Sequence, residues 1–187
     1  DDNGNYLRCT APWDSRKTEF QAARVEGDVT FPSNSRAEYM FYGCTNMVSC
    51  DLSDLDVSNV TWLERFFMGC SALTSVNVST WDTSKVTSMS GMFSGCEKLT
   101  SLNLSNFKTS LVTSFYGMFS GCEVLGSLNL TGWSTANASY FGYMFTDTAL
   151  TSLDLSSFDT SRAADMEGMF QACDSLETLT LSSRFTC

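Results

Sequence analysis

The sequence predicts an α/β repeat solenoid: a right-handed coil with one short parallel strand and one short helix in each repeat of about 26 residues. Three observations predict this fold. Cys44, Cys70, Cys96 and Cys122 follow one another at one constant interval, which sets the length of the repeat. Each of them closes a short motif rich in Met, Phe and Gly, such as MFSGC. A leucine pattern of the form L-x-x-L-x-L then follows, so each repeat is expected to form the same local structure.

The leucine pattern predicts the strand. In residues 101–105 the sequence SLNLS has a period of two, which places Leu102 and Leu104 on one side of the backbone and the polar residues on the other. The same spacing occurs in leucine-rich repeats. Strands of successive coils should therefore pair in a parallel ladder, about 4.8 Å apart, with the leucines facing the core.

The second half of each repeat predicts the helix. Ser84 is a residue type that caps the start of a helix, and Val86, Met89 and Phe93 recur at helical spacing. Gly95 stands where such a helix would end in a left-handed turn. We therefore expect the order strand, turn, short helix and turn in every coil.

Two regions are expected along the chain. Residues 1–47 differ from the rest and are interpreted as an N-terminal cap with a degenerate first coil, which covers the apolar end of the stack. Residues 48–187 form the tandem repeats, at 48–73, 74–99, 100–125, 126–150 and 151–176, with a partial copy at 177–187. The repeat at 126–150 lacks the cysteine and is one residue short.

This repeat resembles the BspA-like leucine-rich repeat, also described as the bacterial surface protein 26-residue repeat. Residues 100–125, TSLNLSNFKTSLVTSFYGMFSGCEVL, carry the L-x-L, Met-Phe and Gly-Cys motifs on one period, and the resemblance covers roughly residues 40–181. It implies a surface-exposed protein, often within a large adhesin that binds host matrix proteins or other cells. It implies no catalytic site.

Composition excludes several classes of function. The net charge is −10, with 21 acidic and 11 basic residues, so nucleic acid is not an expected partner. Polar residues interrupt every apolar run, so no membrane insertion is expected in this segment. The chain has no histidine, the commonest general base and metal ligand. We therefore expect no enzyme, no cofactor and no metal. An enzyme would need a Ser–Lys or a carboxylate pair in a deep pocket.

Six of the eight cysteines follow the repeat, Cys9 and Cys187 lie outside it, and the eight do not form a metal motif. There is no C-x-x-C pair, and stacked cysteines with parallel Cβ vectors suit the disulfide torsion poorly. Buried free thiols are therefore expected in the core, and the pattern leaves the redox state of Cys9 and Cys187 open. The expected buried thiols are Cys44, Cys50, Cys70, Cys96, Cys122 and Cys173.

Two surfaces are candidates for binding. On the helix side, Tyr116, Tyr140 and Tyr143 occupy positions that most other repeats fill with Ser, Gly or a charged residue, and they fall on adjacent coils. Exposed tyrosines at such places often mark contact surfaces. Isolated surface aromatics are the alternative interpretation.

The strand face is the second candidate. Its middle column contains Asp51, Asn77, Asn103, Asn129 and Asp154. This column predicts either a hydrogen-bonding surface for a ligand or a solvated face whose asparagines bond to one another.

These observations favour an adhesion or interaction module at the cell surface or outside the cell. It would bind a host or cell-surface protein or a glycan through one face of the solenoid. A structural spacer within a larger surface protein, without a ligand of its own, is the alternative.

Overall fold

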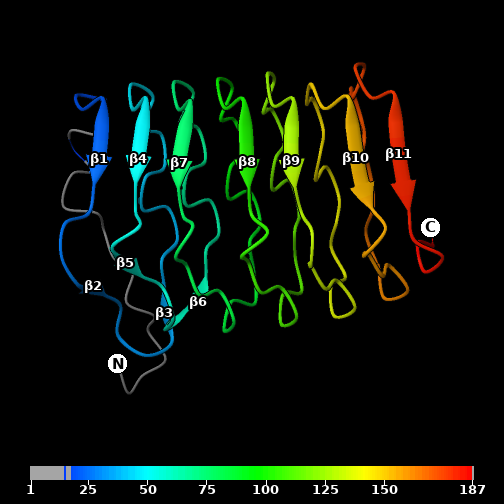
Figure 1. Cartoon of the computed structure of the whole chain (residues 1–187), viewed down its shortest axis with the longest axis horizontal. Coiled ribbons are helices and arrows are strands. Elements are labelled where there is room, and N and C mark those ends of the chain that lie inside the picture. The colour runs from blue at the N-terminus through cyan, green and yellow to red at the C-terminus, as the bar shows by residue number, and fades with distance from the viewer. Residues whose placement is uncertain (1–14, 16–17, 187) are drawn as a thin grey trace.

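A computed structural model describes residues 15 and 18–186 and shows a parallel β-solenoid. Each coil places one short strand beside the strand of the previous coil, and these strands lie in a row along the long axis of the molecule (Figure 1). Every strand pair is parallel. The strands of this row, the strand face, are β1 (Ala22–Arg24), β4 (Ser49–Asp51), β7 (Ser75–Asn77), β8 (Ser101–Asn103), β9 (Ser127–Asn129), β10 (Ser152–Leu155) and β11 (Thr178–Leu181).

The pairing register reproduces the sequence period. Ser101 pairs with Ser127, its equivalent in the next repeat. β1 pairs with β4, so a coil also occupies the segment before residue 48. Additional pairs join this coil to the next one: β2 (Val29–Thr30) with β5 (Leu55–Asp56), and β3 (Ser35–Arg36) with β6 (Val60–Trp62). The shortened repeat keeps its alignment, because Tyr140 still pairs with its equivalent in the next coil, Asp165.

The predicted helix in each repeat is wrong, because no α-helix occurs among the described residues. A right-handed helix needs negative φ throughout, and each coil has two left-handed residues four positions apart. In the coil 74–99 these are Gly91 (φ 62°) and Gly95 (φ 71°). Sequence reasoning assigned Gly95 to the end of a helix and overlooked the second break at Gly91. Within the described chain no helix is long and apolar enough to cross a membrane.

A second ladder between coils replaces the helix and forms the turn face of the solenoid. The N–H groups of Gly91 and Phe93 donate to the carbonyls of Tyr116 (2.8 Å) and Met118 (2.9 Å) in the next coil. Between them, the Met92 N–H donates to the Met89 carbonyl and closes a tight turn (3.2 Å). Every second amide therefore joins coils, and the others close turns. This alternation produces the spacing of apolar residues that resembles a helical pattern.

In the core, the side chains at equivalent positions of successive coils are stacked on one another. Phe93 is stacked on Phe67 with ring centroids 5.4 Å apart and on Phe119 at 6.0 Å. From the strand side, Leu102 and Leu104 are buried against the same cluster. Because a coil buries its apolar side chains only against its neighbours, the stack is stable only as an array.

A column of buried threonines clamps neighbouring coils together. The Thr109 Oγ1 hydroxyl donates to the Ser134 carbonyl (3.0 Å) and accepts the Ser134 N–H (2.9 Å). One side chain thus satisfies both backbone groups of a residue in the next coil. The column consists of Thr83, Thr109, Thr135 and Thr160. The sequence pattern alone had assigned no role to these threonines.

The cysteine column is also a ladder. The Cys96 thiol donates to the Phe67 carbonyl of the preceding coil (3.3 Å), and Cys122 does the same to Phe93 (3.2 Å). The expectation of buried free thiols is confirmed for Cys44, Cys50, Cys70, Cys96 and Cys122, whereas Cys173 near the C-terminal end is free but only half-buried. Cys9 and Cys187 lie outside the described residues. Thr148 replaces the cysteine in the short repeat, and its hydroxyl donates to the Phe145 carbonyl (2.9 Å).

Replacing Gly95 with alanine should lower the free energy of unfolding by about 1–2 kcal/mol, since a Cβ atom is costly at positive φ. The Cβ would also lie 3.5 Å from the Gly69 backbone. Gly126→Ala is the matched control, because Gly126 has an ordinary φ and nothing within 4 Å of the new Cβ. Urea denaturation of the two variants measures the difference. Equal stability of both variants would show that the glycine column is dispensable.

Candidate binding surfaces

Two of the three candidate tyrosines are in contact. The rings of Tyr116 and Tyr143 meet edge to face, with centroids 5.7 Å apart and an interplanar angle of 67°. Tyr140 is half-exposed and forms isolated β-bridges with Ser114 and Asp165 in the neighbouring coils. It does not line the groove, described below, that Tyr116 and Tyr143 border. The structure therefore brings together Tyr116 and Tyr143 and places Tyr140 apart from that groove.

Contacts with the next coil hold the Tyr143 ring in place. Its hydroxyl donates to the Oε1 atom of Glu167 (2.6 Å), and this bond together with the nearby carboxylate charge raises the pKa of Tyr143 to about 12. The ring lies over Gly168, where a Cβ atom would come within 2.6 Å of it. Glycine at position 168 is thus required for the observed ring position.

Tyr116 and Tyr143 border a groove of about 320 Å³ on the turn face, which we call the tyrosine groove. It crosses four successive coils. Its lining consists of Arg65, Met68, Ser90, Gly91, Ser94, Tyr116, Gly117, Ser120 and Tyr143.

The groove exists because one left-handed column changes its side chains along the stack. Arg65 (φ 54°), Gly91 (φ 62°), Gly117 (φ 58°) and Tyr143 (φ 55°) are equivalent positions in four successive coils. The two glycines leave the middle of the column without side chains, and the residues on either side form the walls. The equivalence of Tyr143 with these residues was visible in the sequence. The floor of the groove and its opposite wall follow only from the backbone conformation.

Arg65 provides a partly exposed cation at one end of the groove. Its Nη1 atom donates to the Tyr39 hydroxyl (2.8 Å), and its guanidinium carbon lies 5.5 Å from the centroid of the Tyr39 ring. The Glu64 carboxylate is 3.9 Å away, at the limit of an ion pair. The contacts with the Tyr39 hydroxyl and with Glu64 both use Nη1 and hold that side of the guanidinium in place. A guanidinium has five N–H donors, so donors other than those on Nη1 remain.

The strand-face column is engaged mainly in local turns. The Oδ1 atoms of Asn103 and Asn129 accept the N–H groups of Ser105 (3.1 Å) and Thr131 (3.0 Å), two residues further on. Asn77 makes the same type of contact and also donates to Asp51 (3.0 Å). Hydrogen bonds from Ser53 and Ser156 hold the pKa values of Asp51 and Asp154 below the ordinary range for aspartate.

The strand face also contains a groove, at a break between β7 and β8. The Leu52 N–H donates to the Asn77 carbonyl, and the Leu104 N–H donates to that of Asn129, but no equivalent bond joins Val78 to Asn103. A groove of about 420 Å³, lined by Ser and Asn side chains of both strands, follows this break. It contains Asn77 and Asn103 but no aromatic residue.

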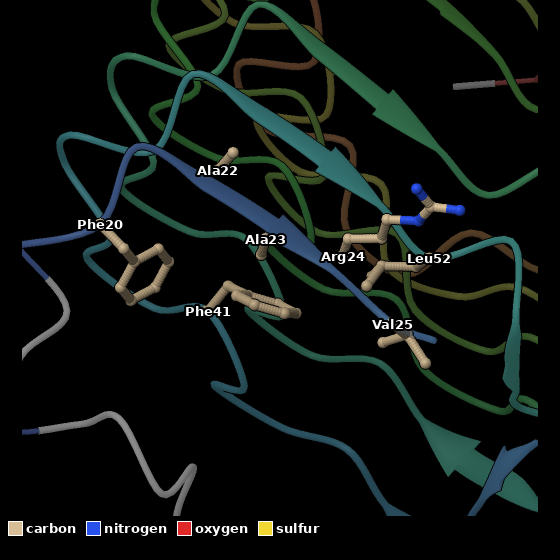
Figure 2. A pocket seen from close by; sticks show the side chains of 7 residues that line it. All are labelled: Phe20, Ala22, Ala23, Arg24, Val25, Phe41 and Leu52. Atoms are coloured by element: carbon tan, nitrogen blue, oxygen red, sulfur yellow. The ribbon is translucent and has the colours of Figure 1, made fainter. Parts of the chain in front are cut away.

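A third cavity, of about 280 Å³, lies at the N-terminal end of the stack. Figure 2 shows Phe20 and Phe41 on one side of β1 and the Arg24 guanidinium on the other. The only charged residue of the lining therefore points away from the apolar rings. This cavity is the end of the core and has no polar group placed to orient a ligand.

Among the described residues, no group of three or more His, Cys, Asp or Glu side chains has an arrangement that could hold a metal ion. The repeated turn aspartates act on the backbone instead. Asp56, Asp82 and Asp159 each accept the N–H of the serine two residues later. These aspartates are therefore turn residues.

Comparison with known proteins identifies the family. The model of a family described as "Mycoplasma protein of unknown function, DUF285" matches residues 35–148 and 63–183. A solved structure of a leucine-rich cell surface protein from Faecalibacterium prausnitzii is similar at 20% identity and a TM-score of 0.49, covering 88% of this chain and 48% of that one. The chain thus spans about half the length of that protein. No curated protein matches the chain. Because the two family matches together cover most of the sequence, the chain belongs to this Mycoplasma and BspA-like repeat family, as its repeat indicated.

Proposed function

We propose that this solenoid is a non-enzymatic interaction module, displayed at the cell surface or outside the cell, that binds an extracellular protein or glycan through the tyrosine groove. The contact between Tyr116 and Tyr143 at the edge of a groove is the observation that carries this proposal. Tyrosines supply a large contact area with little loss of side-chain entropy, which is why they are frequent in binding sites.

Charge and hydrogen bonding favour the tyrosine groove over the strand face. Between residues 66 and 140 there are only three acidic and three basic residues. A ligand that covers this surface therefore removes few charged groups from water, and the free-energy cost of desolvation is small. From residue 147 onward seven acids face two arginines. On the strand face, the side-chain oxygens of the asparagine column already accept backbone N–H groups, which leaves fewer acceptors for a ligand.

A binding screen with two variants tests the proposal. Tyr116→Ser combined with Tyr143→Gly installs the residues that other coils carry at these positions, so the fold should be retained. Ligands found in a screen of matrix proteins and glycans should lose at least about tenfold in affinity, as expected when a central aromatic contact is removed. Surface plasmon resonance measures the loss. Tyr140→Ser alone should have little effect, since Tyr140 does not line the groove.

The control variant replaces Asn77, Asn103 and Asn129 with lysine and tests the strand face. It should retain binding if the tyrosine groove is the site. Loss of binding only in the lysine variant would transfer the site to the groove between β7 and β8. A screen that yields no ligand for the intact chain would favour the structural spacer.

A further inference from the structure

We propose that the tyrosine groove binds an acidic oligosaccharide, with one sugar ring packed against Tyr116 and Tyr143 and the carboxylate of the adjoining ring paired with Arg65. This inference rests on the proposed function, because it assigns a ligand class to the same groove. It combines two observations on opposite walls: an aromatic pair and a cation, separated by a floor of glycine.

The chemistry of the lining favours a saccharide over a peptide main chain. A peptide that binds by strand addition needs free backbone N–H and C=O groups. Here the N–H groups of Gly91 and Gly117 already donate to the next coil, to Tyr116 and Gly142. The groups that remain are side-chain hydroxyls, from Ser94, Ser120 and others, and the faces and edges of tyrosine rings. Sugars present alternating hydroxyl and C–H surfaces that such a lining can match.

The size of the groove fits a small ligand. Arg65 and Tyr143 are three coils apart, which corresponds to about 14 Å at the spacing of neighbouring strands. The volume of about 320 Å³ suits two linked sugar rings and is too small for a folded partner to enter. Gly91 and Gly117 have no side chains, so none projects into the groove from the middle of this column.

Charge complementarity specifies an acidic sugar. Arg65 is the only charged residue in the lining of the groove. Its contact with Tyr39 uses Nη1, so other donors of the guanidinium are available to a carboxylate. A carboxylate would form charge-assisted hydrogen bonds there, whereas a neutral hydroxymethyl group would not.

Two matched saccharides test the assignment on the full chain. Methyl β-cellobioside and its analogue with glucuronic acid as the terminal ring differ only in having a hydroxymethyl group or a carboxylate at C6 of that ring, and we call them the glucoside and the glucuronide. Titrations followed by nuclear magnetic resonance should shift the resonances of Tyr116, Gly117 and Tyr143. The glucuronide should bind about tenfold more tightly, the effect expected of one charge-assisted contact at a partly exposed site.

Two variants separate the roles of the two walls. Arg65→Gln should bring the affinity for the glucuronide down to that for the glucoside without abolishing either. Gly117→Tyr should abolish both, because it fills the floor. The backbone at position 117 accepts tyrosine, since Tyr39 occupies an equivalent position with φ of 60° and is followed in the next coil by Arg65 and not by glycine. Circular dichroism checks that both variants fold.

The outcomes distinguish the two proposals. Absence of shifts with both saccharides at low-millimolar concentration, or equal affinity of the intact chain for the two, would overturn the acidic-saccharide assignment. If the saccharides fail but a protein ligand loses binding in Gly117→Tyr, the groove remains the site and only the ligand class is wrong. If Gly117→Tyr binds every ligand as the intact chain does, both proposals fall.

Discussion

Raising the pH above 9 is expected to destabilise this protein steeply, because its buried thiols resist ionisation. Burial raises the pKa of Cys122 to about 12 and also raises the pKa values of Cys50 and Cys96, and the pKa of Cys70 is raised by its hydrogen bond with Cys44 and by burial. In the unfolded chain the same thiols ionise near their ordinary pKa of about 8.5. At a pH between the pKa of the unfolded chain and that of the folded protein, these thiols therefore lose their protons only when the protein unfolds. The contribution of these thiols to the free energy of unfolding is fully present below about pH 8 and is lost as the pH rises.

The expected slope follows from proton linkage. Each thiol that stays protonated only in the folded state lowers the free energy of unfolding by about 1.4 kcal/mol per pH unit, or about 5.5 kcal/mol for the four together. Urea denaturation between pH 8 and 10, under reducing conditions, measures the slope. A typical domain is stable by about 5–15 kcal/mol, so alkaline unfolding is expected within a few pH units.

Cys122→Thr is the control for this prediction. Thr148 occupies the equivalent position in the short repeat, where it is buried and donates to the Phe145 carbonyl. The variant should therefore fold, and its pH slope should be smaller by about a quarter, or about 1.4 kcal/mol per pH unit. The same slope in both proteins would mean that groups other than the buried thiols cause the alkaline transition.

Thr109→Val is expected to lower the free energy of unfolding by about 2 kcal/mol or more, although the two side chains have nearly the same shape. The substitution removes both hydrogen bonds to Ser134 and leaves its N–H and carbonyl without their partner in the neighbouring coil. The methyl groups of valine cannot replace them. Denaturant unfolding measured at neutral pH gives the change directly.

Thr109→Ser separates the hydroxyl from the methyl group. Serine keeps both hydrogen bonds and loses only one buried methyl group, at a cost of about 1 kcal/mol. The valine variant should therefore be the less stable of the two. The reverse order would show that Thr109 contributes by packing and not by clamping the coils. Thr83 and Thr135 make equivalent bonds, so the same pair of substitutions there provides a replicate.

The tyrosine groove was only partly predictable. The substitutions at positions 116 and 143 were visible as departures from the repeat, and the structure places these two residues in contact. The same reasoning included Tyr140, which lies outside the groove lining. The contribution of Arg65 depends on its position on the left-handed column, and the sequence gives no direct signal of that backbone geometry.

The sequence by itself determined the coil length, the strand positions and the inward residues. A period of two in SLNLS and a constant spacing between the cysteines leave few other arrangements. The tertiary structure decided the other half of each coil. There, apolar residues recur at intervals of three and four, which fits a helix and equally fits a chain of tight turns. Hydrogen bonding to the neighbouring coil selects the turns, because two left-handed residues per coil direct every second N–H outward to the next carbonyl. That partner lies a whole repeat away along the chain, and no local pattern can reveal it.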